Sequence, residues 1–174
     1  MRVSGPAGLL LLALCGASFL AGLDLFVVNV AFQDIRASFP GESLADVSWV
    51  LNVYAITYAA LLIPMGRWSD RFGRRRGFLI GLGVFVLASV GCALSPGLWW
   101  LIGFRALQAV GAAMITPASL AVILTAMPLE RRASAVRIWA SSGAIAAASG
   151  PVVGGFLVEA SWRWVFWLNV PIGL

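Results

Sequence analysis

Long stretches without a charged residue dominate this chain, and they determine the solvent in which it can fold. A helix that spans a bilayer needs about 20 consecutive apolar residues. Of the 174 residues, 61% are hydrophobic and only 11% are charged, which is too little charge to cover the surface of a soluble domain. The charge-free stretches are Val3–Leu23, Val47–Gly66, Gly77–Phe104, Ala106–Leu129 and Ile138–Val158. The sequence therefore predicts an all-α, polytopic membrane protein.

The third stretch is too long for one span, and Ser95-Pro96-Gly97 is a turn signal that divides it. We therefore predict five complete transmembrane helices and the start of a sixth. The complete helices are predicted to cover residues 9–31, 47–65, 77–94, 98–123 and 138–158. The sixth is predicted to begin near Trp164 and to be cut off at Leu174, so that residues 1–174 form one helical bundle.

Arginines are distributed unevenly between the two sides of this topology. Only Arg36 and Arg163 fall on one side, whereas nine arginines fall on the other: Arg2, Arg67, Arg71, Arg74, Arg75, Arg76, Arg131, Arg132 and Arg137. Membrane proteins keep an excess of basic residues in short cytoplasmic loops. The pattern predicts a multi-pass protein of the cell membrane with a cytoplasmic N-terminus. It explains the net charge of +5 without a nucleic-acid partner and adds a modest attraction to anionic membrane lipid.

Asp24 and Arg105 are the ionisable residues that this topology places well inside the spans. A charge at such depth costs at least a few kcal/mol unless it is paired or hydrated. Each lies about seven residues from the outer end of its predicted helix, or roughly 10 Å deep at about 1.5 Å per residue. We expect the two side chains to approach each other or to share a water-filled cavity. Arg105 would then hold Asp24 ionised, and separation would let Asp24 take up a proton. The alternative is a static pair that only locks the first and fourth helices together.

Several polar and aromatic residues are candidates for a substrate pathway. Asn29 and Gln33 are four residues apart and share one helix face, where they could line the outer mouth of a pathway or lie at a helix interface. Tyr54 and Tyr58 on the second helix could stack against a flat substrate. The chain has no histidine, no phosphate-binding loop, no metal-like cysteine spacing and no nucleophile paired with a base. We therefore predict no enzyme activity, no metal and no cofactor, with a proton gradient as the energy source.

Small residues are concentrated in the fifth predicted helix. Ala146, Gly150 and Gly154 recur every four residues, which gives a flat stripe for close packing against another helix. Pro151 lacks a backbone N–H and should bend the helix. Tightly packed, bent helices suit a mechanism in which helices slide past one another.

The basic segment at residues 66–78 resembles the signature of the loop between helices 2 and 3 in the major facilitator superfamily of transporters. The matching residues are Gly66, Asp70, Arg71, Gly73 and Arg74, whereas Trp68 and Arg75 replace the usual leucine and lysine. The glycines would allow a tight turn, and Asp70 is placed to meet a helix N-terminus.

Four further segments resemble signatures of the same family. Residues 101–113, with Arg105 and Gln108, resemble the helix 4 signature assigned to proton coupling, and Gln108 is a further candidate for the substrate pathway. Residues 146–155 resemble the helix 5 signature of antiporters, which this chain matches with Gly150, Pro151, Gly154 and Gly155. Residues 23–31 and 161–173 are similar to segments of the fourteen-span drug:proton antiporters.

The resemblance implies roles for individual residues. Arg105 would support proton coupling, and Asp24 would be the titrating acid or a cation site. A cytoplasmic latch that stabilises the outward-facing state would be formed by Asp70, Arg71 and Arg74. The hinge of the antiporter helix would consist of Gly150 and Pro151.

The length of the chain limits what the resemblance implies. The family has twelve or fourteen spans in two six-helix halves, with substrate bound near the midplane between the halves. This chain would supply the N-terminal half of the major facilitator fold, truncated within helix 6, and its partner would be the missing C-terminal half. The expected function is proton-coupled antiport that exports small hydrophobic or cationic compounds such as drugs. The alternative is a truncated membrane fragment that does not transport and has a structural or regulatory role.

Overall fold

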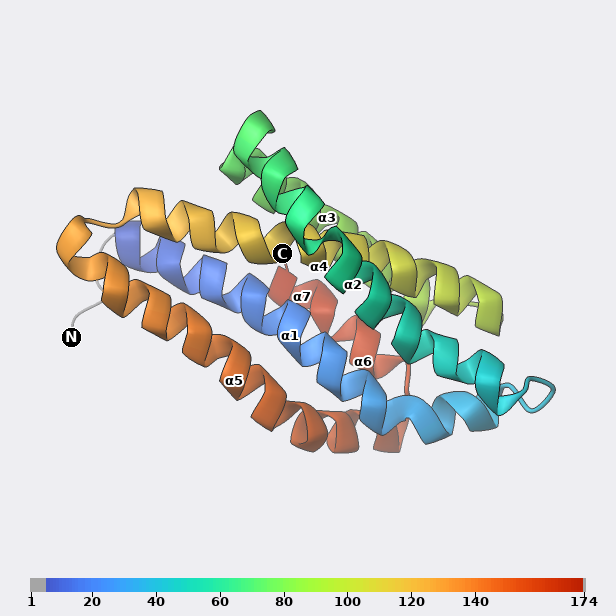
Figure 1. Cartoon of the computed structure of the whole chain (residues 1–174). Coiled ribbons are helices and arrows are strands. Elements are labelled where there is room, and N and C mark those ends of the chain that lie inside the picture. Colours follow the sequence, from blue (N-terminus) through green and yellow to red (C-terminus); the bar gives the residue numbers. More distant parts are fainter. Residues whose placement is uncertain (1–5, 174) are drawn as a thin grey trace.

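The computed structural model describes residues 6–173, and these residues form a bundle of helices (Figure 1). The elements are α1 (Pro6–Ser38), α2 (Leu44–Phe72), α3 (Arg74–Ala93), α4 (Leu98–Ala126), α5 (Leu129–Ala160), α6 (Trp164–Trp167) and α7 (Asn169–Gly173). Helices α1 to α5 are each long and apolar enough to cross a membrane, which confirms the five predicted spans. Arg2 and Leu174, which entered the predicted topology, lie outside the described residues.

The helices extend further than the predicted spans. Helix α1 continues to Ser38 instead of ending near residue 31, and α5 begins at Leu129 instead of near residue 138. The hydropathy of a sequence marks the segment that prefers hydrocarbon, whereas a helix can continue through polar turns beyond it. The start of α2 at Leu44 is fixed by a capping box, in which the Ser43 Oγ accepts from the Asp46 backbone N–H at 3.1 Å.

The basic segment between α2 and α3 is helical almost throughout, which corrects the expectation of a glycine-flanked hairpin. Helix α2 continues to Phe72, and Gly73 alone joins it to α3 with φ of 109°. A residue with a side chain rarely adopts this backbone conformation, so the turn requires glycine. Gly66 lies inside α2, where a Cβ would be 3.3 Å from the Cβ of Pro117 in α4. Gly66 therefore permits close helix packing and makes no turn.

The bundle is organised around α1 and α4 (Figure 1). Helix α5 runs alongside α1, and α4 packs against both α2 and α3. The start of α1 lies beside the connection from α4 to α5. Two apolar clusters fill the interior. Along α1 the clusters meet between Ala21 and Val27, and along α4 they meet between Leu101 and Ala109. Asp24 and Arg105 therefore lie where one apolar cluster gives way to the other.

The sixth span begins at Trp164, as predicted, but it is interrupted. Leu168 separates α6 from α7. Pro171 lacks a backbone N–H and cannot bond to the carbonyl of Trp167, which weakens a continuous helix at this point. Gly173 holds the end of α7 close to α3, because a Cβ at this position would collide with the side chain of Val86.

Candidate functional site

Asp24 and Arg105 form an ion pair in the interior of the bundle. The Arg105 Nη1 contacts the Asp24 Oδ2, and neither residue is exposed to solvent. The expectation that the two side chains approach each other is therefore met. Helix α1 continues to Ser38, so Asp24 lies farther from the end of its helix than predicted. Arg105 does lie about two turns after Leu98, the first residue of α4.

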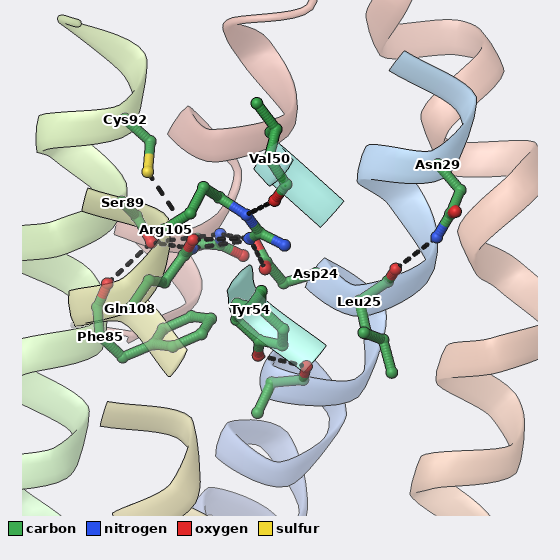
Figure 2. A network of polar contacts seen from close by, with 12 residues as sticks. Asp24, Leu25, Asn29, Val50, Tyr54, Phe85, Ser89, Cys92, Arg105 and Gln108 are labelled. Atoms are coloured by element: carbon green, nitrogen blue, oxygen red, sulfur yellow. Dashed lines mark hydrogen bonds and ion pairs between the residues drawn. The ribbon is translucent and has the colours of Figure 1, made fainter. Parts of the chain in front are cut away.

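Three side chains donate hydrogen bonds to the Asp24 carboxylate (Figure 2). Arg105 of α4 donates to Oδ2. Gln108 Nε2, one turn further along α4, donates to Oδ1 at 2.9 Å, and Asn169 Nδ2 of α7 donates to the same oxygen at 3.0 Å. Ser89 Oγ of α3 lies behind these amides and accepts from Gln108 at 2.8 Å and from Asn169 at 3.3 Å. The carboxylate is thus tied to α3, α4 and α7 at once.

The guanidinium of Arg105 has partners besides Asp24. Its Nε donates to the backbone carbonyl of Val50 in α2 at 3.2 Å, and Nη1 donates to the Gln108 Oε1 at 2.7 Å. The ring of Tyr54 lies 4.1 Å from the guanidinium carbon, in cation–π contact. A buried ion pair is tolerated only when further hydrogen bonds satisfy its remaining polar atoms. These contacts meet that requirement and add α2 to the elements that the pair connects.

The structure does not bring Asn29 or Gln33 into this network. The Asn29 side chain donates to the Leu25 carbonyl of its own helix at 2.7 Å (Figure 2). Gln33 is exposed and lines a shallow hollow near the end of α1, together with Arg36 and Glu42. Both residues therefore remain candidates for a pathway outside the ion-pair network.

A cavity of about 360 Å³ lies between α1, α2, α4 and α5. Tyr54 and Tyr58 line it, with ring planes 9° apart and centroids 6.2 Å apart. Tyr58 donates its hydroxyl to the Thr116 Oγ1 at 3.1 Å. This volume is within the range of small-molecule pockets. The two tyrosines predicted to meet a flat substrate thus lie in a cavity of suitable size, and Tyr54 also contacts Arg105.

Trp139 of α5 also lines the cavity. Its indole N–H donates to the Ser18 Oγ at 2.8 Å and to the Ser119 Oγ at 3.0 Å. The hydroxyls of Ser18 and Ser119 are also 2.9 Å apart. The polar groups of the wall are therefore bonded mainly to one another. The residues that line the cavity are Ser18, Ala21, Gly22, Leu25, Tyr54, Tyr58, Thr116, Trp139, Ala140 and Gly143, and none of them carries a formal charge.

Asp70 and Arg74 connect the ends of α2 and α3. The Arg74 Nε lies 2.8 Å from the Asp70 Oδ1, and Arg74 is the first residue of α3. Asp70 lies in the last turn of α2, so this ion pair links the end of α2 to the start of α3. Arg74 also donates to the Ala121 carbonyl of α4 at 3.4 Å, whereas Arg71 lies over the ring of Phe72 at 5.6 Å. Since Asp70 is more than half exposed, its carboxylate remains accessible to a further partner.

The small-residue stripe of α5 packs against α1, as predicted from its spacing. A Cβ at Gly150 would lie 2.6 Å from the Cβ of Phe26, and one at Gly154 would lie 3.0 Å from the Cβ of Val30. Gly155 belongs to the same sequence pattern, but no atom lies within 4 Å of the position its Cβ would take. The pattern therefore contains glycines that the α1–α5 contact needs and one that it does not.

Several side chains that build these sites were not predicted from the sequence, among them Ser89, Asn169 and Trp139. Asn169 carried a usable signal, since an amide within an apolar segment at membrane depth needs a partner. Ser89 and Trp139 gave none, because serine is common in spans and tryptophan usually marks an interface. Among residues 6–173 there is no group of three or more metal-ligating side chains that could hold an ion.

Comparison with known proteins relates the chain to a family of transporters. The family profile described as Major Facilitator Superfamily matches residues 14–174. A methylenomycin A resistance protein of Bacillus subtilis is 41% identical over 172 residues, which are 98% of this chain and 36% of that protein. The multidrug resistance protein Stp of Mycobacterium tuberculosis is 37% identical over 158 residues, which are 89% of this chain and 29% of that protein. The chain therefore spans about a third of the length of these relatives.

A solved structure has the same arrangement of helices. It is a bacterial homolog of the human lysosomal transporter Spinster in an inward-facing and unoccupied conformation. The match has a TM-score of 0.78 and 26% sequence identity, and it covers 98% of this chain and 41% of that chain.

Proposed function

Because this chain belongs to the major facilitator superfamily of transporters, we propose that it acts as the N-terminal half of a proton-coupled efflux protein. The observation that carries the proposal is the Asp24–Arg105 ion pair of α1 and α4, which is buried completely and connected by hydrogen bonds to three further elements, α2, α3 and α7. An ionisable residue inside a membrane span is costly and points to a proton or ion pathway.

We infer that the Asp24–Arg105 ion pair can separate during transport. In the closed arrangement, Arg105 and two amides hold Asp24 as a carboxylate. If the helices separate, Arg105 keeps two acceptors, the Gln108 Oε1 and the Val50 carbonyl. The arginine is therefore not left unpaired, and Asp24 becomes free to accept a proton. Opening and closing this pair would couple a proton to the movement of α1 against α4.

The substrate would occupy the cavity between α1, α2, α4 and α5. Ala21 and Leu25 line this cavity and flank Asp24 along α1, while Tyr54 contacts both the cavity and Arg105. Substrate binding in the cavity and protonation of Asp24 would thus affect the positions of the same helices. An aromatic wall without formal charge suits a small hydrophobic compound, whereas a cationic compound would need a carboxylate from outside this wall. The resistance proteins among the relatives support a drug-like substrate.

The remaining parts of the proposal concern orientation and partners. The arginine-rich α2–α3 junction would face the cytoplasm of a cell-membrane protein. Asp70 and Arg74 would form a latch with the C-terminal half of the transporter, and Gly150 and Pro151 would let α5 slide along α1. No cofactor is expected, because the proton gradient would supply the energy.

Asp24→Asn is expected to abolish export. We would express the complete product of the open reading frame that contains this sequence, and the 174-residue chain alone, in a bacterium deficient in efflux pumps. The readouts are ethidium efflux and the concentration of methylenomycin A that inhibits growth. The complete product should export until the proton gradient is collapsed, and its Asp24→Asn variant should behave like empty vector.

Asp34→Asn is the matched control, because it makes the same change at an exposed position of α1. Normal export by Asp24→Asn would show that the carboxylate carries no proton. Export by the 174-residue chain alone would show that copies of it assemble into a working transporter and that no second half is needed. No export by either product, despite insertion in the membrane, would favour a structural or regulatory role.

A further inference from the structure

We propose that Asn169 of α7 is a positioning residue for the proton site, which fixes the Asp24 Oδ1 and leaves Oδ2 as the atom that exchanges the proton. This inference rests on the proposed function, in which Asp24 carries the proton. Asn169 acts through Asp24 and need not touch the substrate. Through Asn169, the interrupted sixth span would contribute to proton coupling.

Asn169 is a buried amide in an unusual place. It is 1% exposed and is the first residue after the interruption at Leu168. Irregular backbone at membrane depth is tolerated where it is buried in protein or lines a cavity. The close approach of Gly173 to Val86 holds α7 against α3. The break therefore directs the Asn169 amide toward Asp24 while the rest of α7 stays packed.

The two oxygens of the Asp24 carboxylate have different surroundings. Each carboxylate oxygen can accept about two hydrogen bonds. Oδ1 accepts from both Gln108 and Asn169, at 2.9 Å and 3.0 Å, so its acceptor sites are filled. Oδ2 accepts from Arg105. A proton bound at Oδ1 would have to displace an amide, whereas one bound at Oδ2 requires only that Arg105 move to its other acceptors.

The ionisable groups around Asp24 support a single exchange site. Arg105 faces it from α4, Tyr54 from α2, and the Cys92 thiol from α3 through a 3.8 Å contact with the Gln108 Oε1. From α7 it meets the neutral amide of Asn169. Within residues 6–173 no second carboxylate faces Asp24 that could share or relay its proton.

Asn169→Leu should therefore change the pH at which Asp24 gains its proton. The amide donates to the ionised carboxylate, so its removal disfavours the ionised form and protonation should occur at higher pH. Loss of one donor to a charged acceptor changes such an equilibrium about tenfold, which corresponds to about one pH unit. The midpoint of the Asp24 titration should move to higher pH by this amount, and the pH profile of transport should move with it.

The test is an infrared titration of the purified complete product in lipid. The carbonyl stretch of a protonated carboxyl is followed against pH, and the part of the band that Asp24→Asn removes is assigned to Asp24. Asn169→Leu is compared with Asn169→Ser, which keeps a weaker donor, and with Asn52→Leu, which makes the same change at an exposed position of α2. We expect upward shifts of about one unit, a smaller amount and zero, respectively.

Asn169→Ser keeps the inference testable if Asn169→Leu does not fold, because it should still shift the midpoint upward. An unchanged or lowered midpoint in either folded variant would overturn the role of Asn169. A uniform loss of transport at every pH, without a shift of the profile, would identify a purely structural residue and would also overturn it. If Asp24→Asn removes no titrating band, Asp24 takes up no proton, and the proposed function fails together with this inference.

Discussion

Arg105→Met is expected to destabilise the bundle by about 3–5 kcal/mol, because it leaves a buried carboxylate without its counter-charge. Asp24 is fully buried, and only the neutral amides of Gln108 and Asn169 would remain to hold its charge. Acidic buffer should recover part of the loss, since protonation removes the unpaired charge. The measurement is the midpoint of thermal unfolding in detergent, followed by tryptophan fluorescence.

The double variant Asp24→Asn with Arg105→Met separates stability from transport. Replacing both members of a buried ion pair is often nearly neutral. An asparagine at position 24 retains an oxygen for Gln108 and Asn169, and its new amide nitrogen replaces the Oδ2 that shares the Arg105 Nη1 with the Gln108 Oε1. We therefore expect the double variant to regain most of the lost stability while remaining inactive in efflux.

Arg163→Met is the matched control for this experiment. Arg163 is half-buried, donates to the Ser95 carbonyl at 3.2 Å and lies over the ring of Trp162 at 4.4 Å, but it has no carboxylate partner among these contacts. Its replacement should cost much less than that of Arg105. If the double variant is as unstable as Arg105→Met alone, then the loss comes from the contacts of Arg105 with Val50 and Tyr54 rather than from the unpaired charge of Asp24.

The long helices of this fold could be predicted from the sequence because a bilayer requires each spanning helix to contain a long apolar segment. Apolar length predicted the five spans, and the cost of a buried charge predicted that Asp24 and Arg105 approach each other or share a water-filled cavity. The ends of the helices could not be predicted in this way. Residues 67–72 are rich in charge, yet they continue α2, because a helix does not stop where the hydrocarbon stops.

The composition of the site was only partly predictable, because it depends on the rotation of each helix about its axis. Gln108 follows Arg105 by less than one turn, so its contact with the same carboxylate is local in origin. Asn169 reaches Asp24 only through the break before α7, and Ser89 reaches the amides of Gln108 and Asn169 only through the packing of α3. The role of Tyr54 was only partly predicted. Its ring lines the cavity, but the contact of the same ring with Arg105 was not expected from the sequence.

The glycines of α5 show how sequence pattern and physical need can differ. Gly150 and Gly155 belong to the same pattern, and both are glycines of one helix. Of these two, Gly150 faces α1, because Gly150 and Gly154 follow the period of four that defines one side of the helix, whereas Gly155 lies about 100° away from Gly154. The pattern alone does not rank one glycine above the other, because the ranking depends on α1 being the partner helix.

Gly150→Ala is therefore expected to destabilise the bundle by about 1–3 kcal/mol and to impair transport. The new methyl group would lie 2.6 Å from the Cβ of Phe26, an atom fixed to the α1 backbone that cannot rotate away. Helix α5 would have to move off α1 and lose contact along the stripe. The measurement is again the thermal midpoint in detergent, together with efflux by the complete product.

Gly155→Ala is the matched variant, because it adds the same methyl group to the same helix with no atom within 4 Å. Removing a glycine from a helix interior is favourable by about 0.5–1 kcal/mol, so its stability should be unchanged or slightly higher. Equal losses of stability in both variants would refute the packing explanation. If Gly155→Ala keeps its stability but loses transport, Gly155 serves a state of the transporter in which α5 meets a surface other than α1, and the pattern reports movement as well as packing.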